Sequence, residues 1–199
     1  DCARPEAHAA SAEPVWKTLV FAFRSRRLEA EVPNAYVGQY VASAPERLVG
    51  VATVDPTEEG AVAEARELLE KPEFRALTVS PAAQGFHPAD SRAMGLYEMA
   101  ADRGAPLFLQ QGTHFPRRGS MEYARPFLLD EVAREYPDLT LVISSLGHPW
   151  IEEAIGLLGK HPRVFADIAG LVRRPWQAYN ALVLAHQFNV MDKVLFGSD

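Results

Sequence analysis

The sequence predicts an α/β fold in which a parallel sheet is covered by helices. Short apolar runs recur along the chain, and their starts lie roughly 24 to 34 residues apart, the length of one βα unit. Helical patterns occupy the stretches between the runs. Because the runs are apolar throughout, each predicted strand is expected to be buried on both faces, as in a parallel sheet.

The first predicted strand is the β-branched and aromatic run at residues 17–23. The Ala-rich start, residues 1–16, is expected to be irregular, and the whole chain is expected to form one domain. The remaining predicted strands are 48–54, 76–79, 106–109, 140–143, 164–166 and 194–196.

The clearest predicted helix spans residues 61–71, where apolar and charged residues take opposite faces. Asp55, Pro56 and Glu58 are expected to initiate it, since they supply a capping side chain, a helix-compatible proline and an acid near the positive end of the helix dipole. The other predicted helices are 33–44, 91–103, 123–136, 150–160 and 175–188.

Strand and helix periodicity does not separate a barrel from an open, doubly wound sheet. No Gly-x-Gly-x-x-Gly follows a predicted strand and no phosphate-binding Gly-Lys-Ser/Thr occurs, which favours the barrel. Complete (β/α)8 barrels need about 250 residues. A barrel of 199 residues is therefore expected to lack a strand, a helix or both.

The composition favours a small anionic molecule as partner. The net charge of -6 offers no general attraction for nucleic acid or an anionic membrane, and no apolar run approaches the roughly 18 residues of a membrane helix. Cys2 is the single cysteine, so no internal disulfide is expected, and the cytoplasm is the expected compartment. A homo-oligomer remains an open alternative.

Six segments resemble the amidohydrolase-related family, which includes aminocarboxymuconate semialdehyde decarboxylase, resorcylate-type decarboxylases and small-molecule hydrolases. These segments are residues 32–34, 50–56, 84–88, 111–113, 146–150 and 194–199. The resemblance implies a (β/α)8 TIM-barrel-like fold in which 17–23 is barrel strand 2 and the Phe-Gly-Ser-Asp ending is strand 8. Strand 1, which carries the family's His-x-His, and helix 8 are expected to be missing or reduced.

The resemblance also implies a divalent ion, commonly zinc, at the C-terminal mouth of the barrel. Gln110 and Ser145 fall where the family has the histidines of strands 5 and 6, and Thr78 falls where close relatives have a functional lysine. Carboxamides and hydroxyls are poor zinc ligands beside imidazole. No metal cofactor is therefore expected, Asp199 is the single candidate ligand, and zinc or another divalent metal is expected only if its ligands lie in other segments.

Asp199, His148 and His114 are the candidate catalytic residues, with Asp199 as general acid or base and a histidine assisting. Each has an alternative interpretation. Asp199 could cap a following helix, and the Gly-His-Pro-Trp motif around His148 could simply initiate a helix, with Pro149 at its first position. A rebuilt metal site that includes His87 is a further alternative.

Arginines gather after three of the predicted strands, in loops that share the C-terminal face of any such barrel. They are expected either to bind a carboxylate or phosphate or to form a solvated or oligomeric rim. These residues are Arg24, Arg26, Arg27, Arg117, Arg118, Arg173 and Arg174. The full candidate substrate-binding set is Arg24, Arg117, Arg118, Arg173, Arg174, His87, Gln110 and Ser145.

Three functions follow as hypotheses. The first is a hydrolase or decarboxylase that acts on a small carboxylated molecule without the family's metal. The second is a catalytically inactive barrel that serves binding or assembly. The third is a metal-dependent hydrolase whose ligands lie in segments outside this sequence.

Overall fold

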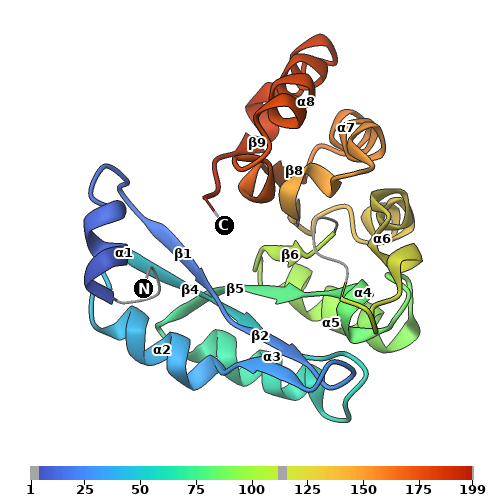
Figure 1. Ribbon diagram of the computed structural model, residues 1–199. Coiled ribbons are helices and arrows are strands. Elements are labelled where there is room, and N and C mark those ends of the chain that lie inside the picture. The colour runs from blue at the N-terminus through green and yellow to red at the C-terminus, as the bar shows by residue number, and fades with distance from the viewer. Residues whose placement is uncertain (1–4, 112–115, 199) are drawn as a thin grey trace.

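The computed structural model describes residues 5–111 and 116–198, and these form a curved parallel sheet with helices on its outer side (Figure 1). The seven strands follow one another in chain order and every neighbouring pair is parallel. The strands are β1 (Thr18–Phe21), β4 (Leu48–Thr53), β5 (Phe74–Val79), β6 (Leu107–Leu109), β7 (Leu141–Ile143), β8 (Val164–Asp167) and β9 (Val194–Leu195). The predicted strands and their parallel order are confirmed.

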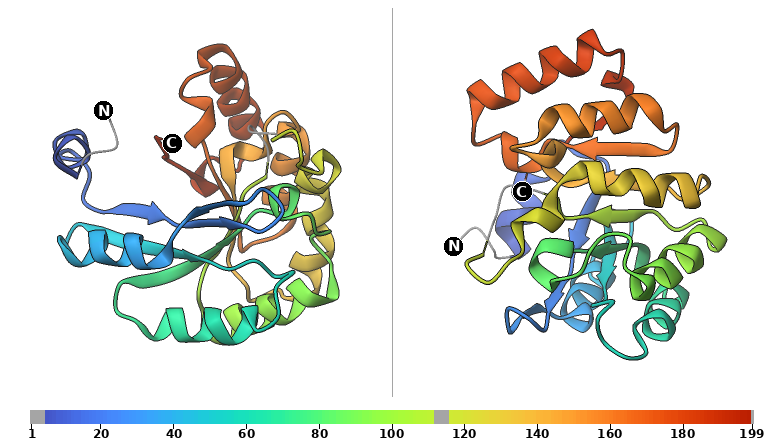
Figure 2. Two further views of the ribbon diagram at one scale, coloured as in Figure 1. Left: turned by 60° about the horizontal axis from the view of Figure 1, so that its bottom comes forward. Right: turned by 90° about the vertical axis from the view of Figure 1, so that its right-hand side faces the viewer.

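Six helices cover the convex side of the sheet, as the amphipathic patterns predict. They are α2 (Asn34–Ala42), α3 (Ala61–Glu70), α5 (Ser91–Asp102), α6 (Leu129–Glu135), α7 (Ile151–Lys160) and α8 (Pro175–Gln187). In the described residues β1 pairs only with β4 and β9 only with β8, so the sheet curls as an incomplete barrel (Figure 2). No helix within these residues is long and apolar enough to cross a membrane.

Several short elements differ from the predicted pattern. The segment expected to be irregular contains a helix, α1 (Pro5–Ser11). The predicted strand 17–23 is split, because its last residue begins an antiparallel hairpin of β2 (Phe23–Ser25) and β3 (Ala30–Val32). A four-residue helix, α4 (Pro81–Gln84), follows β5.

The predicted helix 123–136 also begins late. Its first part forms two 3-10 turns, η1 (Met121–Ala124) and η2 (Pro126–Leu128), before α6 starts at Leu129. Pro126 explains the interruption, since proline has no N–H to donate and disfavours a helical residue before it. The other 3-10 turns are η3 (Ser144–Gly147), η4 (Ala169–Leu171) and η5 (Met191–Lys193).

The expected role of Asp55 in starting α3 is wrong. The helix begins at Ala61, and Gly60, with a φ of 82°, occupies the N-cap position. The Asp55 carboxylate instead accepts hydrogen bonds from the Thr57 N–H (3.0 Å), the Thr57 hydroxyl (2.7 Å) and the Arg26 N–H (3.1 Å). Asp55 therefore joins the loop after β4 to the hairpin after β1.

The sheet carries a separate apolar cluster on each face. The larger cluster lies between the strands and the helices. The smaller one takes one buried residue from each of four adjacent strands, Val51, Ala76, Phe108 and Val142, with Phe21 and Phe165 packed against it. The rings of Phe21 and Phe108 meet edge to face, with centroids 5.0 Å apart. This smaller cluster, the inner layer, fills the concave side of the sheet.

Gly50 in β4 is required by close packing on the outer face. A Cβ at this position would lie 2.7 Å from the Glu73 carbonyl oxygen and 2.7 Å from a ring carbon of Phe74. Both neighbours belong to the strand-pairing region of β5, where Gly50 opposes Phe74. Neither can move without disturbing the sheet.

We expect Gly50→Ala to lower the free energy of unfolding by about 1–3 kcal/mol, because it overpacks a filled site. The matched control is Gly156→Ala in exposed α7, where an added Cβ meets nothing within 4 Å and should raise stability by up to about 1 kcal/mol. Urea unfolding followed by circular dichroism measures both. Equal effects of the two substitutions would contradict this account of Gly50.

Candidate functional site

At the C-terminal mouth of the sheet lie the residues that come two positions after each inner-layer residue along its strand. Because side chains alternate along a strand, Thr53, Thr78, Gln110 and Asp167 belong to the same face as that layer. The Thr53 hydroxyl donates to the Thr78 carbonyl (3.3 Å), and the Thr78 hydroxyl is buried without a hydrogen-bond partner among the described residues. Among the described residues, these four strand ends therefore present three uncharged polar side chains and one carboxylate.

The turn after β7 is held by Asp167, a residue that the sequence analysis did not select. Ser145, Leu146 and Gly147 all have positive φ, at 55°, 48° and 62°. One Asp167 carboxylate oxygen accepts from the Ser145 N–H and from the Ala169 N–H, each at 2.9 Å. The Ser145 hydroxyl oxygen accepts from the Gly170 N–H at 3.1 Å. The sequence signal that could have identified Asp167 is an acidic residue directly after the apolar run 164–166.

His148 follows this turn, and its side chain is partly exposed at the mouth. Its Nδ1 atom is buried and has no hydrogen-bond partner among the described residues. Burial, and then the positive charge of Arg174, lower the pKa of His148 below its ordinary value of 6.5. The imidazole is therefore mainly neutral at pH 7.

The helix-initiation reading of the His148 motif is correct only in part. Glu152 and Glu153 occupy the first turn of α7, as expected, but the helix begins at Ile151. Pro149 therefore lies before the helix and not at its first position. The peptide bond between His148 and Pro149 is cis.

The arginines after β1 are largely engaged with neighbouring groups. Arg24 donates to both carboxylate oxygens of Glu64 at 2.9 and 2.5 Å and also lies 3.2 Å from a Glu58 oxygen. The hydrogen bond to Glu64 raises the pKa of Arg24. Arg27 Nε donates to the Arg118 carbonyl (2.6 Å), and the Arg118 guanidinium lies 3.3 Å from Glu29. The structure thus brings the hairpin and the loop after β6 together.

The remaining rim arginines differ from these in their partners. Arg174 donates from Nη1 to the Gly170 carbonyl at 2.7 Å and acts electrostatically on His148. Arg117 and Arg173 are exposed, and neither forms an ion pair with any other described residue. Their guanidinium groups are therefore available to an external anion, as is that of the exposed Arg26, which also forms no ion pair with a described residue.

Gln84 is a second residue that the sequence analysis did not select. Its buried amide donates to the Arg24 carbonyl (2.7 Å) and the Val54 carbonyl (2.8 Å), and its oxygen accepts from the Ser80 N–H (2.8 Å). One side chain therefore fastens the segments that follow β1, β4 and β5. No local pattern marks such a residue, because two of its three partners are backbone groups 30 and 60 residues away in the sequence.

The other sequence candidates have separate surroundings. The Gln110 side chain is exposed at the end of β6, and its N–H donates to the Val79 carbonyl at 3.0 Å. His87 Nδ1 accepts from the Ala89 N–H (3.1 Å), and its ring meets Tyr123 edge to face. His114 and Asp199 lie outside the described residues.

The described residues at the mouth do not offer a donor set that fits a divalent transition metal. Across residues 5–111 and 116–198, no three His, Cys, Asp or Glu side chains come together in a way that could hold an ion. Ser145 already uses its hydroxyl oxygen as an acceptor for Gly170, and Gln110 offers only a neutral carboxamide.

Comparison with solved structures agrees with the architecture. The chain superposes on an uncharacterized TIM-barrel protein from Bordetella bronchiseptica with a TM-score of 0.77 at 22% identity, covering 97% of this chain and 69% of that one. It superposes on 5-carboxyvanillate decarboxylase from Sphingomonas paucimobilis with a TM-score of 0.71 at 13% identity, covering 100% and 72%.

A third similar structure is 2,6-dihydroxybenzoate decarboxylase from Rhizobium, with a TM-score of 0.67, 13% identity and coverage of 99% and 77%. No curated protein sequence matches the chain. At these identities the structural likeness shows the fold alone. The sequence model of a family described as amidohydrolase matches residues 4–199. The chain therefore belongs to the amidohydrolase family.

Proposed function

We propose that this protein hydrolyses or decarboxylates small carboxylated molecules at the C-terminal mouth, without the family's standard metal site. The observation that carries the proposal is the partly exposed imidazole of His148 at the mouth, whose pKa is lowered by burial and then by the charge of Arg174. A neutral imidazole is suited to general-base chemistry near pH 7. An arginine beside it suits a negatively charged substrate.

The chemical role of His148 is the same in both reactions. In hydrolysis it takes a proton from the water that attacks the substrate carbonyl. In decarboxylation of a hydroxyaryl acid it takes the phenolic proton and returns that proton to the ring carbon, whose bond to the carboxylate breaks to release carbon dioxide and leave the phenolate. Asp199 and His114, which lie outside the described residues, remain the proposed acid-base partners.

The proposed anchors for the substrate carboxylate are Arg117, Arg173 and Arg174. Arg24 and Arg118 already pair with carboxylates of this chain, so they contribute less to capture of an external anion. Similar structures support an aromatic carboxylate as substrate class. One is a 5-carboxyvanillate decarboxylase complexed with manganese and a nitrobenzoic acid, and another is 2,6-dihydroxybenzoate decarboxylase complexed with 2,6-dihydroxybenzoate. Manganese in the former belongs to that protein.

The second candidate is an inactive barrel that binds or assembles with a partner. The poor metal donor set at the mouth favours it. A stacked pair of exposed aromatic side chains on α8, Trp176 and Tyr179, supplies a surface for assembly, including assembly with a second copy.

Assays with 5-carboxyvanillate, 2,6-dihydroxybenzoate and carboxylated aryl esters discriminate the enzyme from the inactive barrel, because only an enzyme releases carbon dioxide or alcohol. The cytoplasm is the proposed compartment for either function.

We expect small anions to bind at the mouth and to bind less tightly as salt concentration rises, since exposed charges are screened. Titration of succinate and inorganic phosphate by calorimetry measures this. Arg117→Gln together with Arg173→Gln should abolish the binding. Arg66→Gln, an equal loss of charge per site on exposed α3, should leave it in place. Anion binding that survives the double substitution would show that the rim arginines are structural.

We expect the activity to depend on a group that titrates below pH 6.5, the ordinary pKa of histidine. Only the neutral imidazole acts as base, so kcat/KM should rise with pH through the lowered pKa and then stay constant. His148→Gln should reduce kcat/KM by about 100-fold or more. Arg174→Gln removes a positive charge, so it should raise the pKa of His148 and move the acidic limb to higher pH. If the acidic limb of the pH profile does not move in Arg174→Gln, Arg174 does not influence the pKa of the catalytic base.

We expect the purified protein to contain no stoichiometric zinc or manganese, because Gln110 and Ser145 are weak ligands. Elemental analysis after purification without added metal is the measurement. Stoichiometric metal that disappears in Asp199→Ala would establish the family's site in this chain and overturn this part of the proposal.

A further inference from the structure

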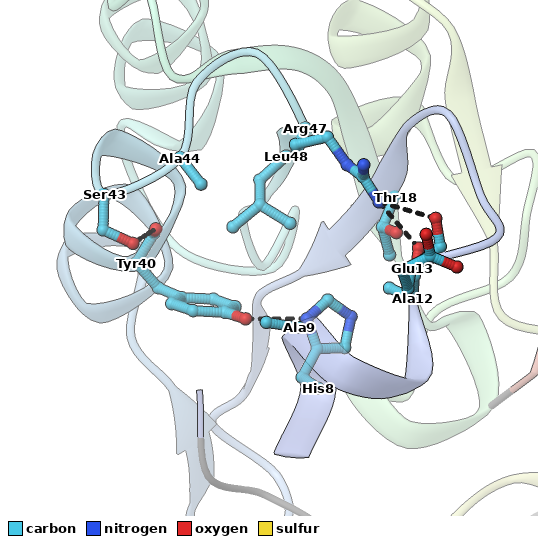
Figure 3. Close-up of a pocket in the computed structure, with 10 residues that line it drawn as sticks. All are labelled: His8, Ala9, Ala12, Glu13, Thr18, Tyr40, Ser43, Ala44, Arg47 and Leu48. Atoms are coloured by element: carbon cyan, nitrogen blue, oxygen red, sulfur yellow. Dashed lines mark hydrogen bonds between the residues drawn. The ribbon is translucent and has the colours of Figure 1, made fainter. Parts of the chain in front are cut away.

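A cavity of about 410 Å³ lies away from the mouth, between α1 and α2. Its floor includes Thr18 and Leu48, the first residues of β1 and β4, so it opens at the opposite ends of the strands from His148 (Figure 3). Its volume lies within the roughly 300–1,000 Å³ typical of small-molecule sites. The cavity is therefore separate from the site proposed above.

The cavity is open because small alanine side chains line much of it where α1 meets α2. The sequence of α1 is Pro-Glu-Ala-His-Ala-Ala-Ser, and Ala9 lines the space together with Ala12 and Ala44. Leucine or phenylalanine at those three positions would fill the groove between α1 and α2. Three alanines and Leu48 instead leave open, apolar walls that suit the hydrocarbon part of a ligand.

Polar groups converge on this apolar space from two sides. His8 and Tyr40 join α1 to α2 through a 2.7 Å hydrogen bond between His8 Nδ1 and the Tyr40 hydroxyl, and their rings meet edge to face. Arg47 lies across from them (Figure 3). Its Nη2 donates to the carbonyls of Ala12 (2.8 Å) and Glu13 (3.2 Å).

The engagement of Nη2 fixes the guanidinium at the cavity and leaves its other N–H groups without an acceptor among the described residues. Arg47 forms no ion pair with any of these residues, including the exposed Glu13 that also lines the cavity. A fixed cation with unused donors beside apolar walls matches a carboxylate attached to a hydrocarbon.

We propose that the cavity between α1 and α2 is a second binding site, which takes a small apolar carboxylate. Arg47 binds the carboxylate, the alanines and Leu48 contact the hydrocarbon, and the linked pair of His8 and Tyr40 closes the far side. Glu13 opposes the ligand charge and limits its affinity. The proposal is independent of the chemistry at the mouth.

Octanoate titrated into the 199-residue chain by calorimetry is the direct test, with octanol as the uncharged control. We expect octanoate to bind more tightly than octanol. Arg47→Gln should weaken octanoate binding about tenfold, the ratio that one charge-assisted hydrogen bond contributes. Glu13→Gln should strengthen it, because it removes a like charge.

A matched pair of substitutions keeps the test valid if loss of Arg47 loosens α1. Ala44→Leu places a larger side chain in the cavity and should abolish binding. Ala42→Leu makes the same change at an exposed position of α2 that does not line the cavity, and should leave binding intact. Thermal unfolding followed by circular dichroism confirms that both variants are folded.

Three outcomes would overturn the proposal. The first is failure of octanoate to bind. The second is binding that Ala44→Leu leaves unchanged, or that Arg117→Gln with Arg173→Gln removes, since this would assign octanoate to the mouth. The third is a dimer in sedimentation experiments that only Ala44→Leu dissociates, because a second copy would then occupy the groove.

Discussion

Parallel pairing of seven short strands is the constraint on which the rest of this molecule depends. Because parallel strands all end at the same edge, every loop that follows a strand is delivered to one mouth. The alternation of side chains then divides each strand between the helix-covered core and the inner layer around Phe108. Residues two positions further on, such as Gln110 and Asp167, reach the mouth as a consequence of that pairing.

Buried polar side chains then convert the strand ends into a defined site. Asp167 accepts hydrogen bonds from backbone N–H groups in the turns after β7 and β8. Gln84 links the segments after β1, β4 and β5 through hydrogen bonds to their backbone groups. Burying such a polar side chain costs desolvation free energy, and this cost is offset only when all its hydrogen bonds are formed. The positive φ values of Ser145 and Leu146 persist because these contacts hold the turn.

The arginines around the mouth differ in whether a carboxylate balances their charge. Arg24 and Arg118 are balanced by carboxylates of the hairpin and α3, whereas Arg117 and Arg173 are not paired with any described acid. Arg174 instead faces His148, where its charge adds to burial in lowering the imidazole pKa. The chemistry proposed for the mouth therefore rests on the side of the barrel formed by β7 and β8, and the α1–α2 cavity lies at the other end of the strands.

The sequence by itself determined the order, type and direction of the main elements, because apolar runs and amphipathic periods are local properties of the chain. The replacement of the family's metal ligands by Gln110 and Ser145 follows from the resemblance and stays a prediction. Only the tertiary structure decided that Asp55 ties two loops together and does not cap α3, that Arg24 is held by Glu64, and that Asp167 and Gln84 organise the mouth. Those outcomes depend on partners 22 to 60 residues away in the sequence, and such distances are set by how the strands pair and not by any local pattern.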